Sequence, residues 1–283
     1  MRPSRPVPTG RGRGGAGVGG RGRAGGGGAG ARAGSRAGAG TGYRAGAGAG
    51  AGARAGAGAG ARMAWVEGEA GSAELRACAS LRAQSFAVYP EGRGQFTREA
   101  HLRMLSRLEW ERLEAKLAGE DAESAHLRVR ALLAALPAAE LEADTGNGET
   151  APDRSCQLVG SSGGPEHVVG SLDLNIGAWL PSEPLRGARP AASAEGGRAY
   201  LSNVCVAPGA RRRGVAAGML ACAADRAREE GVSDLYVHVV ADNTPALELY
   251  LRCGFQVEGE ESKNLAATSG HARRLLLHQT LVL

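Results

Sequence analysis

The stretch from residue 199 to residue 254 constrains the fold of this chain more than any other part of its sequence. "AYLSNVCVA" (199–207) is rich in strand-forming residues, and "GVAAGMLACAADRAREEG" (214–231) predicts a helix with a glycine at its end. "SDLYVHVVA" (233–241) predicts a second strand, and "TPALELYLRCG" (244–254) predicts a short helix with proline in its first turn. Together with antiparallel strands predicted upstream, this strand–helix–strand unit indicates a mixed α/β sheet.

The rest of the chain predicts helices before the sheet and strands after it. The second predicted helix has leucines at 102, 105, 108, 113 and 117 that approximate one apolar face. The segment 125–137 fits either a strand or a helix. The expected elements are helices over 73–86 and 97–118, a loop over 138–155, a hairpin over 157–177, a second loop over 178–198, and closing strands within 255–260 and 272–283.

The first 62 residues differ in composition from everything that follows. They hold 24 of the 46 glycines and eleven arginines, with no lysine and no acidic residue. A segment without a periodic apolar face cannot bury enough surface to offset the entropy lost on ordering. We therefore predict a disordered segment over 1–62 and one folded domain over 63–283.

Composition also narrows the function classes. Beyond residue 62 the chain has 23 Lys and Arg residues and 29 Asp and Glu residues, so the positive net charge of the whole chain comes from the tail. The folded part lacks the basic footprint of a nucleic-acid-binding protein. The five cysteines form no Cys-x-x-Cys pair and no Cys/His cluster, which argues against a disulfide framework and against a metal site.

The tail has the composition of an organelle transit peptide, which is rich in arginine and poor in acidic residues. It differs from one in its dominance by Gly and Ala, with Ser4 and Ser35 as its only serines. "RGRGG" (11–15) also resembles an RNA-binding segment, and a third reading is filler upstream of a true start at Met63. The chain has neither a secretory apolar core nor an 18-residue apolar run, so we expect a soluble protein that does not enter a membrane.

The loop "APGARRRGVA" (207–216) follows a predicted strand and precedes a predicted helix. Its spacing is Arg211-x-x-Gly214-x-Ala216. Glycine lets the backbone approach an anion, and the first N–H groups of the helix together with its dipole favour a phosphate there. A solvated basic loop is the alternative for such a turn taken alone.

Two motifs together resemble the GNAT superfamily of acyl-CoA-dependent N-acyltransferases. The loop matches the pattern Arg/Gln-x-x-Gly-x-Gly/Ala of that family, and "DLYVHVVADNTPALELYLRCGF" (234–255) matches its second block. The matching residues in that block are Asn243, Ala246, Tyr250, Gly254 and Phe255. Most of residues 75–278 also resemble a plastid subgroup that acetylates lysines and protein N-termini.

The resemblance implies a GNAT fold, a mixed central sheet flanked by helices with a splayed strand that binds acetyl-CoA. A bulge would leave backbone groups of that strand free to bond the pantetheine amides. The loop amides would receive the pyrophosphate, and Asn243 would bond the cofactor arm. The residues assigned in this way to acetyl-CoA are Val204, Cys205, Val206, Arg212, Arg213, Gly214, Val215, Ala216, Ala217, Asn243, Thr244 and Pro245.

The resemblance also assigns Tyr250 as the general acid that protonates the departing CoA thiolate, a role open to a phenol with a pKa near 10. The alternative for Tyr250 is a packed core tyrosine. The strand before the loop carries no carboxylate, so His238 is the first candidate for the general base and Asp173 a weaker one. A structural histidine is the alternative at 238. Cys205 lacks an evident activating partner, which argues against a covalent acyl-cysteine route.

These features predict a plastid stromal protein acetyltransferase that uses acetyl-CoA without a metal. It would modify α-amines and lysine ε-amines of proteins by direct attack in a ternary complex, with no nucleic-acid or membrane partner. A small-molecule amine acetyltransferase is the alternative within enzymes. A nuclear or RNA-associated binding protein with an Arg/Gly tail is the alternative outside them. The oligomeric state is not predicted.

Overall fold

The computed structural model describes residues 60–66, 72–89, 92, 94–142, 153–160, 163–177 and 197–282. Nearly all of the predicted disordered segment and of the predicted 178–198 loop lie outside these ranges. The last residue assigned to that segment, Arg62, begins a strand and forms an ion pair with Glu166 at 2.6 Å.

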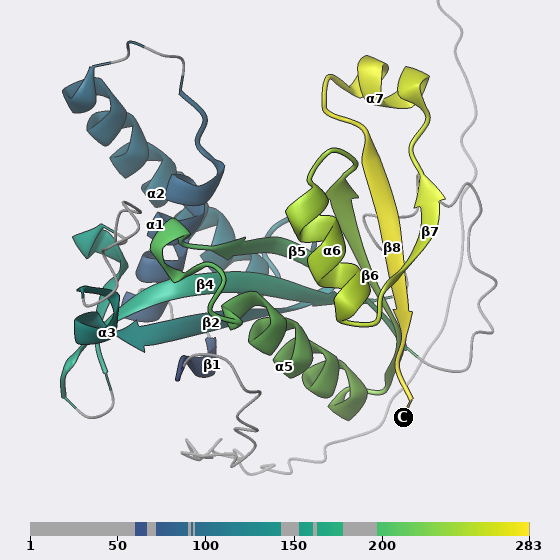
Figure 1. Ribbon diagram of the computed structural model, residues 1–283, viewed down its shortest axis with the longest axis horizontal. Helices are drawn as coiled ribbons and strands as arrows, with labels where there is room; N and C mark the ends of the chain where they lie inside the picture. Colours follow the sequence, from purple (N-terminus) through teal and green to yellow (C-terminus); the bar gives the residue numbers. More distant parts are fainter. Residues whose placement is uncertain are drawn as a thin grey trace, which may run out of the picture. The chain divides into compact units, whose positions relative to one another are not determined.

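The described part of the chain contains a mixed eight-stranded sheet (Figure 1). The strand order is β1-β2-β4-β5-β6-β8-β7, with β3 paired to β4 on a side branch. Each neighbouring pair is antiparallel except β5 and β6, which are parallel. The strands are β1 (Arg62–Val66), β2 (Arg128–Pro137), β3 (Gln157–Val159), β4 (Pro165–Ile176), β5 (Gly197–Val206), β6 (Val232–Val240), β7 (Gln256–Glu260) and β8 (Arg274–Thr280).

Helices cover both faces of the sheet. Alternation along β4 shows this, because Gly170 lies against Met219 of α5 whereas the next side chain, Ser171, contacts Arg82 of α1. Figure 1 shows α5 and α6 in front of the strands. The helices are α1 (Ala73–Phe86), α2 (Gln95–Ala118), α3 (Ala138–Glu142), α5 (Val215–Glu229), α6 (Thr244–Arg252) and α7 (Lys263–Ser269), with short 3₁₀ turns η2 (Arg154–Cys156) and η3 (Pro208–Ala210).

Local sequence explains where the principal helices begin and end. The Ser72 hydroxyl accepts a hydrogen bond from the Leu75 backbone and caps α1. α2 ends at Gly119, whose left-handed backbone (φ 72°) terminates the helix. The main core includes the buried central residues of β2 and β4 and the apolar face of α5. A second, smaller cluster consists of Leu127, Val129, Tyr200, Tyr236 and Leu276.

Several sequence-based expectations need correction. The ambiguous segment 125–137 forms a strand, β2, because every residue from Ala131 to Leu136 is buried within the sheet. The predicted loop 138–155 contains α3 and part of η2, and the strand β1 and the helix α7 were not predicted. The leucine face of α2 is not a core face, since Leu113 is buried while Leu108 is 53% exposed. Among the described residues, none of the helices combines the length and apolar character that a membrane span requires.

Candidate active site

The strands β5 and β6 form a fork. They pair in parallel only over Gly197–Leu201 and Val232–Val237, and beyond that point β6 continues to pair with β8. β5 continues beside β4, so the edge of Ser202–Val206 that faces β6 has no strand partner within the described residues. Figure 1 shows the two strands diverging. Buried backbone groups need hydrogen-bond partners, which makes this open edge a candidate ligand site.

A β-bulge lies where the fork opens. Ser171 of β4 pairs with Cys205 of β5. Asp173 pairs with Ser202, so β5 has one residue more than β4 between the two pairs. Asn203 has φ 54°, the left-handed conformation adopted by the first residue of a glycine-type bulge. The structure thus confirms the splayed, bulged strand that the family resemblance implies.

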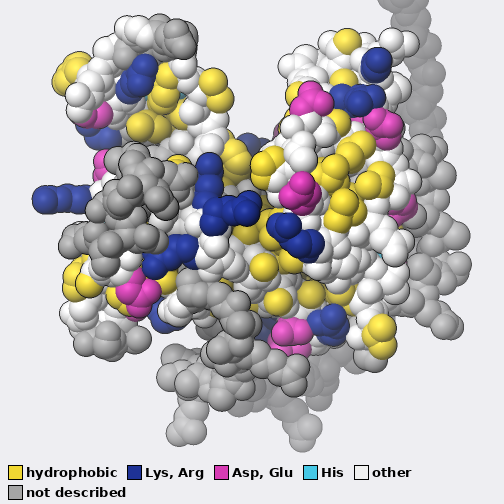
Figure 2. Space-filling model, in the orientation of Figure 1, with side chains coloured by type: hydrophobic (Ala, Val, Ile, Leu, Met, Phe, Trp, Pro, Cys, Tyr) yellow, Lys and Arg dark blue, Asp and Glu magenta, His cyan; other side chains and the backbone are white. Residues whose placement is uncertain are grey.

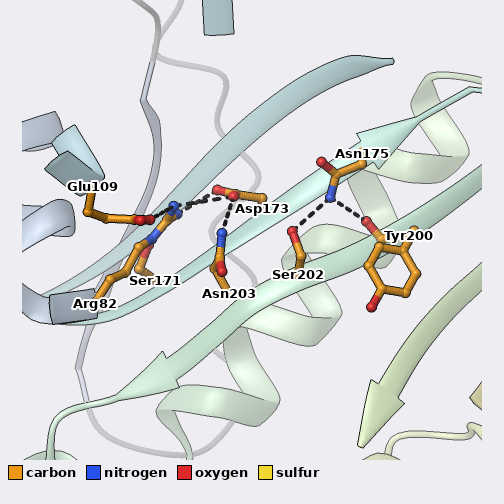
Figure 3. A network of polar contacts seen from close by, with 8 residues as sticks. All are labelled: Arg82, Glu109, Ser171, Asp173, Asn175, Tyr200, Ser202 and Asn203. Atoms are coloured by element: carbon orange, nitrogen blue, oxygen red, sulfur yellow. Dashed lines mark hydrogen bonds and ion pairs between the residues drawn. The ribbon is translucent and has the colours of Figure 1, made fainter. Parts of the chain in front are cut away.

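A buried polar network lies beneath this bulge (Figure 3). Arg82 of α1 donates to both carboxylate oxygens of Asp173, with 3.2 Å between Nη1 and Oδ2. Asn203 Nδ2 donates to the same Oδ2 at 2.8 Å. The Asp173 side chain is fully buried. This geometry argues against Asp173 as a general base, because both of its oxygens are engaged and an incoming amine has no access to them.

The loop between β5 and α5 presents its backbone N–H groups. Arg212 (φ 62°) and Gly214 (φ 77°) are both left-handed and lie on either side of Arg213. Such alternation turns successive N–H groups toward one side and forms an anion-binding concavity. α5 begins at Val215 with no side-chain cap, so its first N–H groups and its dipole favour an anion. Figure 2 shows basic side chains gathered near the middle of this face, around the start of α5.

Tyr250 projects from α6 into the core. Its side chain is buried, and its ring packs edge-on against Phe255 with 5.6 Å between centroids. Burial, together with the nearby Tyr200 phenol, raises the pKa of Tyr250 well above its ordinary value of 10. The hydroxyl therefore keeps its proton at any physiological pH, which is the form that a general acid must have.

His238 lies on β6 one residue beyond the last pair with β5. Its Nδ1 is 2.9 Å from the Tyr200 hydroxyl, and its Nε2 is buried without a hydrogen-bond partner among the described residues. Burial, assisted by Arg274, lowers the pKa of His238 to about 4, so the imidazole is neutral at pH 7. Burial also raises the pKa of Tyr200 to about 12. The pair can accept a hydrogen bond from an amine or water without carrying charge.

Tyr250 and His238 differ in their relation to β6. Side chains alternate along β6, and Val237 and Val239 share the main core with Tyr250. His238 points to the other face, where it contacts Tyr200. A neutral imidazole thus lies where the β5–β6 pairing ends, and a protonated phenol is packed in the main core with the neighbouring residues of β6.

Known proteins with similar sequences decide the family. A sequence profile described as the acetyltransferase (GNAT) family matches residues 129–255. GCN5-related N-acetyltransferase 7, chloroplastic, of Arabidopsis thaliana is 36% identical over 208 residues, which cover 72% of this chain and 71% of that relative. The chain belongs to the GNAT family. It is therefore an acetyltransferase of GNAT type.

Two further relatives match shorter parts of this GNAT protein. GCN5-related N-acetyltransferase 6, chloroplastic, of A. thaliana is 41% identical over 98 residues, covering 32% of this chain and 34% of that relative. Streptothricin acetyltransferase of Streptomyces lavendulae is 29% identical over 133 residues, covering 47% of this chain and 60% of that relative.

The fork and the loop fit the acetyl-CoA that GNAT enzymes use. The open edge of Ser202–Val206 offers backbone donors and acceptors in strand geometry, as the amides of a pantetheine arm require. The left-handed Gly214 and the uncapped start of α5 provide the donors that a pyrophosphate requires. The described residues contain no group of three or more His, Cys, Asp or Glu side chains arranged to hold a metal ion.

The remaining predicted site residues of this GNAT protein lie at the start of α6 and in β5. Asn243 is exposed, and its side-chain oxygen caps α6 by accepting from Ala246 N at 3.3 Å. This capping explains Asn243 without a ligand and leaves its amide group as the part that a cofactor could contact. Thr244 and Pro245 are exposed in the first turn of α6. Burial raises the pKa of the Cys205 thiol to about 11, which argues further against a covalent cysteine route.

Sequence reasoning missed Arg82, Tyr200 and Asn203. Arg82 belongs to a helix whose other buried residues are mostly small or apolar, and nothing local predicts its distant partner. A signal existed in β4, where Ser171 and Asp173 alternate with apolar neighbours. Such alternation usually indicates a solvent-facing side of a strand, whereas here α1 covers those polar side chains.

Proposed function

We propose that this GNAT enzyme acetylates protein amines, α-amines of N-termini and lysine ε-amines, by direct attack on acetyl-CoA in a ternary complex. The observation that carries the proposal is the fork, with Tyr250 on one face and the His238–Tyr200 pair on the other. Two chemically different sides suit a reaction in which a donor and an acceptor enter from opposite directions.

Acetyl-CoA, when bound, supplies an acetyl group held as a thioester. The open edge of Val204–Val206 would hold its amides like an added strand, and the amides of 212–217 would bind the pyrophosphate. Holding the thioester at the fork fixes the acetyl carbon next to the entering amine, which removes most of the entropic cost of bringing the two reactants together.

Proton movements complete the transfer. As the amine nitrogen bonds to the acetyl carbon and the carbon–sulfur bond breaks, His238 accepts the proton that the nitrogen loses. Tyr250 donates its proton to the departing thiolate. Acceptance at Nε2 requires the tautomer in which His238 Nδ1–H donates to the Tyr200 oxygen. Because the pKa of His238 is lowered to about 4, this base is weak, which favours amines that are already partly neutral.

The surface around the fork supports a large acceptor. Figure 2 shows a wide hollow between the lobe built from α1 and α2 and the lobe that carries α7. Exposed apolar side chains lie along the first of these lobes, with Phe86 55% exposed and Phe96 78% exposed. An open hollow with apolar walls suits an extended polypeptide better than a small polar amine.

A small-molecule acceptor is the second candidate. The similarity to streptothricin acetyltransferase favours it, since the name of that relative denotes a small-molecule substrate. Plastid location is part of the main proposal, supported by the two relatives named chloroplastic and by the acid-free N-terminal segment.

The test is acetyl transfer by the full-length chain to a peptide library and to a panel of amines that includes streptothricin, read by mass spectrometry. We expect transfer to peptide N-termini and lysines at rates well above those for the small amines. Efficient transfer to a small amine with inert peptides would support the second candidate. A fluorescent fusion of residues 1–62 tests the plastid assignment, since nuclear fluorescence would contradict it.

A further inference from the structure

The polar network beneath the β5 bulge consists of buried side chains. Ser171, Asp173 and Asn175 are adjacent same-face positions of β4, and each is buried. Arg82, which is 1% exposed, lies over the first two. A buried ion pair contributes little net stability, because desolvation of the two charges offsets their attraction. The location of the network therefore calls for another explanation.

The network connects three elements at the point where the fork opens. Arg82 holds Asp173 from α1, and its Nε and Nη2 also donate to Ser171 Oγ at 3.1 and 2.9 Å. Asp173, which is on β4, accepts a hydrogen bond from the side chain of Asn203 on β5. One step away, Asn175 Nδ2 donates to the Tyr200 backbone oxygen at 2.9 Å (Figure 3). The contacts that run from Arg82 through Asp173 end at Asn203, which is the left-handed residue of the bulge.

We propose that Arg82 and Asp173 are positioning residues that hold Asn203 in its left-handed conformation and thereby keep the cofactor edge of β5 open. Asparagine enters this conformation more readily than most residues but still does so at a cost relative to glycine. The hydrogen bond to Asp173 offsets that cost. Arg82 fixes the carboxylate, because its planar guanidinium contacts both oxygens.

This inference rests on the proposed use of the open β5 edge by acetyl-CoA. It adds a specific mechanical role for a pair of residues that contact neither reactant. A purely structural role for the pair makes a different prediction, since loss of stability is not repaired by changing one bulge residue. The role of Asn203 therefore provides the test.

The principal variant replaces the ion pair by apolar residues, Arg82→Met with Asp173→Leu, in the full-length chain. Removing both charges avoids an unpaired buried charge, so we expect the fold to persist. Without its tether, Asn203 should leave the left-handed region more often. We expect the Kd for acetyl-CoA, measured by calorimetry, to rise roughly tenfold, which corresponds to the ~1–2 kcal/mol cost of this conformation for a non-glycine residue.

The rescue variant adds Asn203→Gly to that pair. Glycine adopts the left-handed conformation without a tether, so we expect the Kd to return to within about threefold of the wild-type value. Asn203→Gly alone should bind like the wild type, whereas Asn203→Val should bind about tenfold more weakly, since a β-branched side chain opposes this backbone. Glu109→Gln is the matched control, because Glu109 contacts Arg82 at 3.3 Å but not the bulge.

Circular dichroism shows first whether each variant is folded. If the apolar pair fails to fold, Arg82→Lys, which keeps a cation but loses the two-pronged contact, is compared with and without Asn203→Gly. A folded pair variant with wild-type affinity overturns the proposal, as does a rescue variant that binds no better than its parent. Gly214→Glu distinguishes failure of the proposed cofactor site from failure of the positioning role. If this variant binds acetyl-CoA normally, the proposed cofactor site fails. If it loses binding while the pair variants bind normally, only this inference fails.

Discussion

The two halves of β5 belong to one strand and have different surroundings. Residues 199–201 pair with β4 on one side and with β6 on the other, whereas Ser202, Cys205 and Val206 pair with β4 alone. Residues 198–201 of the first half are buried, whereas in the second half only Cys205 is buried and its neighbours are half-buried. The difference arises from one inserted residue, Asn203, and from the polar network that holds it.

This difference shows how a sheet can create a binding site without a special sequence. A strand whose backbone is fully paired contributes to stability, and the same strand with one free edge can bind a ligand through its backbone. Catalytic side chains then need only flank the opening. His238 follows the last residue of β6 that pairs with β5 and contacts Tyr200, and we expect Tyr250 of the main core to flank the opening from the other face.

The largest expected effect concerns the loop that follows the open half of β5. Gly214→Glu adds a carboxylate and a side chain at a left-handed position beside the proposed pyrophosphate site. We expect acetyl-CoA binding to become undetectable by calorimetry while the far-ultraviolet spectrum is unchanged. The control is Gly119→Glu, with the same charge at a similar backbone angle (φ 72°) after α2. A folded Gly214→Glu protein with wild-type affinity contradicts the loop assignment.

The next effect separates binding from chemistry at the fork. Tyr250→Phe removes one hydroxyl and almost no volume, so the Kd for acetyl-CoA should persist. Turnover should fall by roughly 10²–10⁴-fold, the range for loss of a general acid. Steady-state kinetics with a peptide acceptor measure this, and Tyr89→Phe, outside the fork, is the matched control. Wild-type turnover would mean that Tyr250 only packs against Phe255.

A smaller effect compares two amines on the other face of the fork. A lysine ε-amine has a pKa near 10.4 and an α-amine one near 7.7–8.0, so at pH 8 the neutral form costs lysine roughly 3 kcal/mol and an N-terminus a few tenths. With only a weak base at His238, lysine acetylation should rise about tenfold per pH unit from about pH 7 to 9. N-terminal acetylation should level off near pH 8.

The measurement uses two peptides at saturating acetyl-CoA, one with a free N-terminus and a blocked lysine, the other with the reverse. His238→Ala is assayed beside the wild type, and its activity should be lower and recover toward high pH. Parallel profiles for the two amines would reveal a strong base elsewhere. An unaffected His238→Ala enzyme would make His238 a structural residue.

The smallest effect concerns His238, which lies where β5 and β6 stop pairing, and its contribution to the free energy of unfolding. The pKa of His238 is about 4 in the folded protein against an ordinary value of 6.5. As the pH falls from 6.5 toward 4, the unfolded chain therefore binds the proton first, and the free energy of unfolding decreases. Allowing for the partial exposure of His238, the loss is about 1–2 kcal/mol by pH 4.5.

Urea unfolding at pH 7.5 and pH 4.5 measures this contribution. His238→Gln should lose less stability than the wild type over the same interval, while His126→Gln, at an exposed position, should follow the wild type. Equal losses in all three proteins would show that His238 is well solvated and that its ring is not held in a dry fork.

Much of this fold could be predicted from sequence, and the reasons differ between elements. The strand–helix–strand unit and the two N-terminal helices were confirmed, because their periodicity and their caps lie within a few residues. β2 was ambiguous because "ALLAAL" is apolar at every position, and only burial on both faces of the sheet explains its strand conformation. Short elements such as β1 and α7 carry too little local signal.

Some parts of the candidate site could likewise be predicted from local sequence, and others could not. The loop with Gly214 and the helix with Tyr250 are local motifs, so their spacing alone indicated them. The contacts of Arg82 with Asp173 and of Tyr200 with His238 join residues 91 and 38 positions apart. Pairings at such separations depend on strand register, and single-sequence periodicity contains no information about register. Asn203 was missed because a bulge is one inserted residue without a sequence signature of its own.

Amide hydrogen exchange on the full-length chain, with and without CoA, tests the central claim most directly. If the open half of β5 and the loop hold the cofactor, amides in 204–206 and 212–217 should exchange markedly more slowly when CoA is bound. Amides in 199–201, already paired on both sides, should be unchanged. Protection that appears elsewhere, while 204–206 and 212–217 exchange as in the free protein at saturating CoA, would contradict the account.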